Sequence, residues 1–111
     1  MIEATMRTFL EEQLNVPTFL EHEKTMPSEY IIIEKTGGSS SNFIFTSTLA
    51  IQSISSTMAK ASKLNEKVKT LLLMNVPKSV SSCKLNSDYN FTDTETKQYR
   101  YQAVYDVTHY E

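Results

Sequence analysis

The chain has 111 residues, a length that corresponds to one domain with a single, modest core. Its net charge of −2 argues against a general nucleic-acid binder, and its single cysteine, Cys83, excludes an internal disulfide and fits a reducing cytosol or a particle assembled there. No apolar run reaches the roughly 18 residues of a membrane span, and residues 1–5 lack the basic and apolar segments of a secretory signal, so we expect neither.

The first predicted element is a helix over residues 2–14, where apolar side chains recur at the spacing of one helix face. Asn15 and Pro17 end it, because proline holds the preceding residue in an extended conformation. Residues 18–23 are a candidate for a short strand, and we expect a turn at residues 26–28.

A β-hairpin is predicted next. Residues 30–35 contain consecutive β-branched side chains, which fit a strand covered on both faces, either by the chain itself or by a partner. Residues 36–41 hold both glycines and are expected to form the hairpin tip, since glycine adopts a positive φ without strain. Residues 42–54 alternate between apolar and polar, as in a strand with one covered face. The side chains expected on that covered face are those of Phe43, Phe45, Leu49 and Ile51.

A second helix and a second hairpin are predicted in the C-terminal half. The period changes at residues 55–57, where any of three hydroxyl groups is suited to cap a helix over residues 57–75. A strand over 79–86, a polar turn over 86–96 and a long strand over 97–110 follow. One face of the last strand is expected to carry Tyr99, Tyr101, Ala103, Tyr105 and Val107.

This order of elements predicts an α+β fold in a single domain that spans residues 1–111: a mostly antiparallel β-sheet with two α-helices packed on one face. The strands over 42–54 and 97–110 are about twice as long as the usual ~5–6 residues. Strands of this length carry hairpins beyond the core of a small domain, where they aggregate or pair with a neighbour. We therefore expect this chain to assemble with further copies of itself.

The chain has few of the residues that nucleophilic catalysis or metal binding requires, so we expect no enzyme, no cofactor and no metal site. Cys83 and His109 lie on strands that can be neighbours, but no nucleophile signature surrounds Cys83, and a small buried side chain is the preferred interpretation. His22 lies between two glutamates without a second ligand at metal spacing. A hydrolase that uses Cys83 is kept only as the last alternative.

Three further patterns have an ordinary structural explanation. The pair Gly37 and Gly38 lacks the following helix and the lysine–serine pair of a phosphate loop. The acidic residues of the 86–96 turn lack the spacing and central glycine of a calcium loop. The tyrosine stripe of the last strand is better explained as a core face than as a platform on which bases stack.

Charge is unevenly distributed along the chain. Residues 60–84 are rich in lysine and contain Glu66 as the only acid, whereas the segments on either side are acidic. Complementary packing between copies would account for this distribution. A solvated, lysine-rich helix face would account for it as well and is the preferred interpretation.

Several segments, taken in order, resemble one protein family. They are residues 43–53 (FIFTSTLAIQS), 58–68 (MAKASKLNEKV) and 85–94 (LNSDYNFTDT), the last followed by 99–102 (YRYQ). With the leading helix and the strand at 30–35 (YIIIEK), the chain resembles the tail terminator (tail completion) proteins of long-tailed bacteriophages, especially those of Gram-positive hosts and their prophages.

The resemblance implies a structural protein without catalysis or cofactor. Such proteins form a hexameric ring that caps the tail tube, stops polymerisation of the major tail protein and joins the tail to the head–tail connector. Phage DNA passes through the lumen without sequence-specific binding. The implied place is the head–tail interface of the virion, after assembly in the cytoplasm of the bacterial host. Residues expected at contacts with other copies or partners are Gly37, Gly38, Ser39, Asn42, Lys60, Lys63, Lys67, Asp93, Glu95 and Arg100.

Two other functions stay open. A head–tail joining or stopper protein of the same particle is the closest alternative, and such connectors tend to be either all-β or rich in helix. A small DNA-binding module is a different class, in which Lys60, Lys63 and Lys67 would contact phosphates. Binding of that kind weakens steeply as salt is added.

Overall fold

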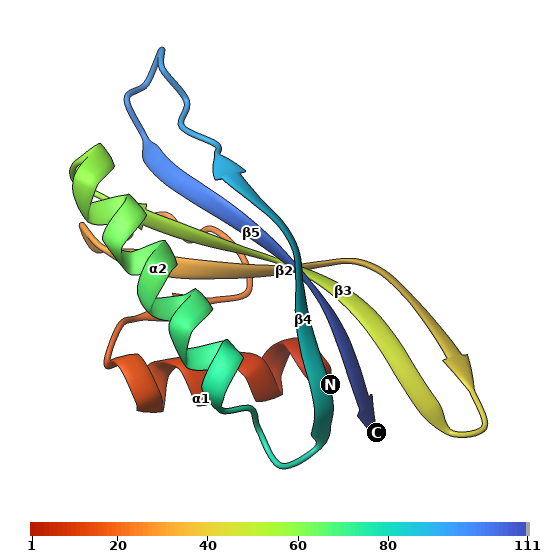
Figure 1. The fold of residues 1–111 in the computed structure, drawn as a ribbon. Helices are drawn as coiled ribbons and strands as arrows, with labels where there is room; N and C mark the ends of the chain where they lie inside the picture. The colour runs from red at the N-terminus through yellow and green to blue at the C-terminus, as the bar shows by residue number, and fades with distance from the viewer. Residues whose placement is uncertain (111) are drawn as a thin grey trace.

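The structure is a computed structural model that describes residues 1–110. Along the chain the elements are α1 (Ile2–Leu14), β1 (Thr18–Phe19), β2 (Tyr30–Ser41), β3 (Ile44–Ser55), α2 (Met58–Met74), β4 (Val80–Asn90) and β5 (Tyr99–Tyr110). The strands form one five-stranded sheet in the order β1-β2-β3-β5-β4. Among the described strands only β1 and β2 pair in parallel, and both helices lie on one face of the sheet (Figure 1). The predicted α+β fold is confirmed.

The main core lies between the helices and the sheet. Alternate residues of β2, β3 and β5 point toward the helices, and their apolar side chains meet those of both helices there. The largest contributors are Met6, Leu10, Ile31, Ile33, Leu49, Ile51, Leu64, Val68, Leu72, Tyr105 and Val107. The predicted apolar faces of the two helices are therefore core faces, and so is the part of the last strand's face that carries Ala103, Tyr105 and Val107. Tyr99 and Tyr101, predicted on the same face, are half-buried and lie outside this core.

A second, smaller cluster covers the opposite face of β2. Tyr30 and Ile32 pack there with Ile54 of β3, against Phe19 and Met26 from the segment that precedes β2. The strand segment at residues 30–35, expected to be covered on both faces, has apolar side chains packed on both faces of β2. The chain supplies the second cover itself, so a partner is not needed at this point.

The C-terminus of α1 and the N-terminus of α2 lie where local chemistry predicts. Asn15 adopts the left-handed conformation (φ 56°) after α1, and its N–H donates to the Glu11 carbonyl at 2.9 Å. Thr57 is the residue that caps α2, because its side-chain oxygen accepts the N–H of Lys60 at 3.2 Å. The helix predicted over 57–75 runs from Met58 to Met74.

The tip of the first hairpin differs from the prediction. β2 continues through both glycines to Ser41, and the turn consists of Asn42 (φ 52°) and Phe43 (φ 66°). Two consecutive positive φ values are typical of the type I′ turn, whose twist matches that of the strands it joins. The glycines lie instead beside a β-bulge at Thr36, where the register with β3 shifts. Phe43 is thus a turn residue and does not lie on the covered face of β3.

The second hairpin is also longer than predicted. β4 extends to Asn90, because residues 87–90 pair with β5 after a register shift at Asn86. β5 begins at Tyr99 instead of residue 97, since Lys97 takes a positive φ of 55° in the connection. The predicted turn over 86–96 therefore shortens to the connection 91–98.

The two hairpins extend in opposite directions. β3 and β5 are antiparallel, with Ile44 opposite Tyr110 and Ser55 opposite Tyr99, so the tips of the two hairpins lie at opposite ends of the sheet (Figure 1). The molecule is elongated as a result, with extents of 45 × 27 × 25 Å.

Candidate interaction surfaces

The tip of the β2–β3 hairpin carries four of the residues predicted for contacts with partners. Gly37, Gly38, Ser39 and Asn42 are all exposed there. No charged side chain occurs between residues 36 and 48, so this tip can be buried against a partner without removing an ion from water. Next to them, the aromatic ring of Phe43 is 92% exposed. The sequence assigned that ring to a covered face, and its exposure follows from the position of the turn.

At the opposite end, Arg100 is engaged within its own hairpin. Its Nε donates to the Phe91 carbonyl at 2.7 Å, and its Nη1 donates to Oε1 of Gln98 at 2.8 Å. The guanidinium also lies 4.7 Å from the centre of the Phe91 ring, a cation–π distance. Arg100 therefore shapes the β4–β5 hairpin, whether or not that hairpin contacts a partner.

Asp93 shapes the same connection. Its carboxylate accepts the N–H of Glu95 at 3.1 Å and that of Thr96 at 3.4 Å. These hydrogen bonds, those from Thr96 first, lower the pKa of Asp93 from its ordinary value. Glu95 itself is exposed at the turn. Of the three residues predicted on this hairpin, Glu95 is the one whose side chain is most free to meet a partner.

The exposed side of α2 carries the remaining predicted residues. Lys60, Lys63 and Lys67 are exposed and recur at helical spacing, so they share one face. Lys69 is different, because its Nζ lies 2.8 Å from Oε2 of Glu66 and 3.3 Å from Oδ2 of Asp88 on β4. The hydrogen bond to Glu66 is the main cause that raises the pKa of Lys69. The ten predicted residues therefore occupy three separate surfaces: two hairpins and one helix face.

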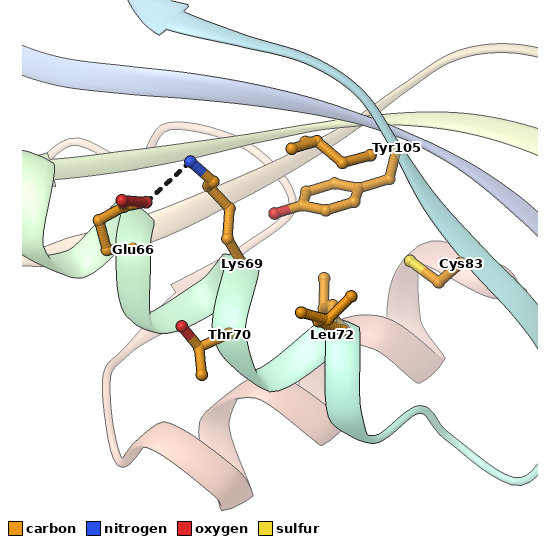
Figure 2. Close-up of a pocket in the computed structure, with 8 residues that line it drawn as sticks. Glu66, Lys69, Thr70, Leu72, Cys83 and Tyr105 are labelled. Atoms are coloured by element: carbon orange, nitrogen blue, oxygen red, sulfur yellow. Dashed lines mark ion pairs between the residues drawn. The ribbon is translucent and has the colours of Figure 1, made fainter.

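A cavity that sequence reasoning missed opens between α2 and β4. We call it the α2–β4 cavity; its volume is about 260 Å³, and it is lined by Glu66, Lys69, Thr70, Leu72, Leu73, Cys83, Leu85 and Tyr105 (Figure 2). The lining is largely apolar, and its two charged residues, Glu66 and Lys69, are paired with each other, while Lys69 also pairs with Asp88. Two apolar side chains at the cavity stay exposed: Leu73 at 86% and Leu85 at 45%.

Besides the Glu66–Lys69 pair and the hydroxyl of Thr70, the polar groups that line the α2–β4 cavity are a thiol and a phenol. Burial, with a smaller contribution from the charge of Asp106, raises the pKa of Cys83 to about 11. Burial also raises the pKa of Tyr105, whose side chain is only 2% exposed. The Tyr105 hydroxyl has no hydrogen-bond partner among the described residues. In Figure 2 its ring reaches from β5 toward α2 and ends at the side where Glu66 and Lys69 lie.

These positions bear on the alternative of a hydrolase. A thiol with a raised pKa is protonated at neutral pH and is a poor nucleophile. His109 is hydrogen-bonded to Ser47, whose Oγ lies 2.8 Å from Nε2. Ser47 and His109 are 1% and 2% exposed, so a substrate has no access to this second pair. Neither arrangement supports nucleophilic catalysis.

The surroundings of His22 are those of a surface residue. His22 is exposed and packs its ring edge-on against Tyr30, with the ring centres 6.2 Å apart. Within residues 1–110, no three His, Cys, Asp or Glu side chains gather in a way that would hold a metal ion. Over the same residues, neither α1 nor α2 is long and apolar enough to cross a membrane.

Comparison with known proteins adds no assignment to these surfaces. No model of a known protein family matches the chain, and no curated protein sequence is similar to it.

Proposed function

We propose that this chain is a structural protein of a long-tailed bacteriophage that closes into a ring on the end of the tail tube. The ring, hexameric as in the family that the sequence resembles, ends polymerisation of the major tail protein and joins the tail to the head–tail connector. DNA passes through its lumen without sequence-specific binding. The protein assembles in the cytoplasm of the bacterial host and works at the head–tail interface of the virion.

The observation that carries this proposal is the pair of hairpins that extend past the core in opposite directions (Figure 1). β2 stays paired with β3 out to Ser41, although every side chain of β2 beyond Ile33 is exposed. β4 stays paired with β5 out to Asn90, although its side chains from Lys84 onward are exposed. Ordering this much backbone costs entropy that the chain's own core does not offset. Contacts with neighbouring copies would offset it.

The two outer edges of the sheet favour a ring over a symmetric dimer. β4 forms one edge, and β2 forms most of the other, since β1 pairs only with Ile31 and Ile32 in the described part of the chain. A contact that joins two different surfaces is heterologous and repeats from copy to copy until the rotation closes. We expect each such interface to bury at least about 1,200 Å². Exposed lysines of α2 would then meet acids of the next copy.

The sheet face that points away from the helices suits the lumen. Thr46, Thr48, Gln102 and Thr108 on that face are polar without charge. The strand register also places charged residues there, two of each sign, so that their charges sum to zero: Glu34, Lys84, Arg100 and Asp106. A surface of this kind neither attracts phosphates strongly nor repels them, so DNA would slide past it.

Phage particles that lack this protein test the proposal. Electron microscopy is expected to find tails of uncontrolled length that are not joined to heads. Tails of normal length, firmly attached to filled heads, would contradict the assignment. The mass of the purified protein, measured by light scattering at increasing concentration, tests the ring independently of the tail.

A small DNA-binding module is the second candidate, and the three lysines that share the exposed face of α2 are the observation that favours it. Fluorescence anisotropy with labelled duplex DNA, in low and high salt, separates it from the ring proposal. Tight binding that falls steeply with salt and is lost when Lys60, Lys63 and Lys67 are changed to Gln would favour the DNA-binding function.

A further inference from the structure

We infer that Phe43 of one copy inserts into the α2–β4 cavity of the next copy and that this contact is the repeating joint of the ring. The inference rests on the proposed function, because it names the side chain and the receptor that the ring would use. It joins two features that the isolated chain leaves unexplained: an exposed aromatic ring on a strained turn, and a largely apolar cavity lined by a buried tyrosine hydroxyl that has no hydrogen-bond partner among the described residues.

Phe43 occupies a position that the chain alone would not favour. It takes a positive φ of 66°, a region that residues with a Cβ rarely adopt. The second position of a type I′ turn is usually glycine, and the favoured pair is Asn-Gly, whereas this chain has Asn42 and Phe43. The ring is also 92% exposed at the end of a projecting hairpin. Backbone strain combined with apolar exposure is the pattern of a residue that acts on a partner.

The α2–β4 cavity has the matching properties. Its volume of about 260 Å³ exceeds the ~150 Å³ at which an apolar cavity already accepts benzene. Leu72, Leu73 and Leu85 supply an apolar lining, and Leu73 and Leu85 remain exposed until something covers them. The cavity lies beside β4, at an open edge of the sheet, so that a hairpin from outside can approach it.

The charges of the hairpin tip and of the cavity edge also favour the tip that carries Phe43 as the occupant of the cavity. Residues 36–48 contain no charged side chain, and the ions of the cavity lining, Glu66 and Lys69, are already paired at 2.8 Å, with Asp88 a further partner of Lys69 at 3.3 Å. Insertion of this tip therefore places no unpaired ion in an apolar site.

The Tyr105 hydroxyl, one of two hydroxyls that line the cavity, favours a hairpin tip over a bare apolar group as the occupant. Tyr105 is 2% exposed, and its hydroxyl lacks a partner among the described residues. A buried hydroxyl without a hydrogen bond is costly. The turn residues Asn42 and Phe43 lie outside the β2–β3 ladder, which ends at Ser41 and Ile44. Their peptide groups arrive together with the aromatic ring and can supply the missing hydrogen bond.

The same chain cannot fill its own cavity. Tyr105 pairs with Leu49 of β3, and Phe43 lies six residues further along the hairpin, which is about 20 Å at ~3.3 Å per residue. The ring must therefore enter another copy. Because the tip and the cavity are different surfaces, the contact is heterologous and propagates from copy to copy.

Disulfide trapping tests the contact directly, because Cys83 is the only thiol of the chain and lines the cavity. The variant Phe43→Cys is oxidised with copper phenanthroline, and the products are separated on a non-reducing gel. We expect a ladder of covalent dimers, trimers and larger species that dithiothreitol collapses. Mass spectrometry should find the peptide of residue 43 joined to that of Cys83.

Three controls define the result. Wild-type protein should give no ladder, and neither should Ser39→Cys, which introduces a thiol on the same hairpin away from the turn. The double variant Phe43→Cys/Cys83→Ala should give no cross-link with itself, but it should form a mixed dimer with wild-type chains. Dimers of the double variant alone would mean that tips meet tips, which would overturn the inference.

The strength of association between copies, measured without cross-linking, is a second test of the Phe43 contact. Sedimentation equilibrium should find Phe43→Ala at least about tenfold weaker in association, as expected for a central aromatic anchor, and Phe43→Leu close to wild type. Phe91→Ala, an exposed aromatic on the other hairpin, is the matched control and should keep its association. If rings form and neither the ladder nor the tenfold loss is seen, this contact is wrong while the ring stands. Normal tails in particles that lack the protein would instead refute the proposed function.

Discussion

Ser47 and His109 form a hydrogen bond inside the core, with the serine Oγ 2.8 Å from the histidine Nε2. Ser47 lies diagonally across β3 and β5 from His109, whose direct cross-strand partner is Phe45, and the ring of Phe45 stacks on that of His109 with the ring centres 5.8 Å apart. Because both groups are buried, Ser47→Ala is expected to destabilise the fold by about 1–3 kcal/mol, measured as the free energy of unfolding in urea. Ser39→Ala, on the exposed hairpin, should change stability by less than about 0.5 kcal/mol. Equal stability of the two variants would mean that the buried bond contributes nothing.

Cys83 should make the stability of the fold depend on alkaline pH. Burial raises its pKa in the folded protein from 9.0 to about 11, so the folded state holds the thiol proton more tightly than the unfolded chain does. The stability that this difference contributes is fully present below pH 9.0 and is lost as the pH rises through about 11. Wild-type protein is therefore expected to lose more stability between neutral and alkaline pH than Cys83→Ala, in urea denaturation at each pH. The comparison cancels the lysines and the tyrosines that lie away from Cys83, which the two proteins share; Tyr105 does not cancel fully, because the charge of Cys83 contributes to its raised pKa. Parallel losses would contradict the prediction.

Tyr105→Phe should stabilise the isolated chain by about 1 kcal/mol, because it removes a buried hydroxyl that has no partner among the described residues. Tyr30→Phe is the matched control. The Tyr30 hydroxyl accepts a hydrogen bond from Nε2 of Gln98 at 3.3 Å, so its removal should destabilise the fold by about 0.5–1.5 kcal/mol. Thermal unfolding of dilute monomer gives both values. A loss of stability in Tyr105→Phe would show that the hydroxyl is already satisfied.

Arg100→Ala is expected to loosen the β4–β5 hairpin while leaving the core intact. The side chain joins the Phe91 carbonyl, the Gln98 amide oxygen and the Phe91 ring, all within the hairpin. Hydrogen exchange of the amides of residues 91–98 should accelerate, whereas those of the other hairpin should not change. Arg100→Lys should behave like the alanine variant, because lysine keeps the charge but lacks the planar fork. Protection equal to wild type in Arg100→Lys would mean that charge alone holds the hairpin.

Phe43→Gly should affect stability and assembly in opposite directions. Glycine removes the strain of a positive φ at this turn and creates the favoured Asn-Gly pair, so the monomer should gain about 0.5–1 kcal/mol. The same change removes the aromatic ring, so association should weaken at least about tenfold. Asn42→Gly keeps the ring and replaces a residue that already tolerates positive φ, so both quantities should stay close to wild type. Retained association in Phe43→Gly would count against the Phe43 contact alone.

Much of the fold was predictable because its core side chains follow simple periods. Helix α1 spans the predicted residues 2–14, and the alternation of β5 correctly identified the face that Tyr105 and Val107 bury. Turns were less predictable. The two glycines drew the predicted tip into residues 36–41, yet the positive φ values in the described chain belong to Asn15, Asn42, Phe43 and Lys97. Glycine content indicates where the backbone can turn with little strain, whereas the pairing of β2 with β3 determines which residues form the turn.

The candidate surfaces were harder to predict, for two physical reasons. Bulges at Thr36 and Asn86 shift the register, so that counting alternate residues along β2 or β4 assigns side chains to the wrong face beyond them. Contacts such as that of Ser47 with His109, or of Lys69 with Asp88, join residues that only the fold brings together. The α2–β4 cavity has the same origin, because its lining comes from a helix and two strands. A list of exposed polar residues could not anticipate it.

The shortness of β1 has a practical consequence for anyone who handles the isolated chain. Among the described residues it pairs with β2 only at Ile31 and Ile32, and beyond them no strand lies beside this edge of β2. Glu34 and Lys35 follow shortly after the pairing with β1 ends, and the β-bulge at Thr36 comes next. Opposite charges and a bend are the usual safeguards against sideways fibril growth. Neutralising Glu34 and Lys35 for the sake of tighter crystals or higher yield would invite precipitation.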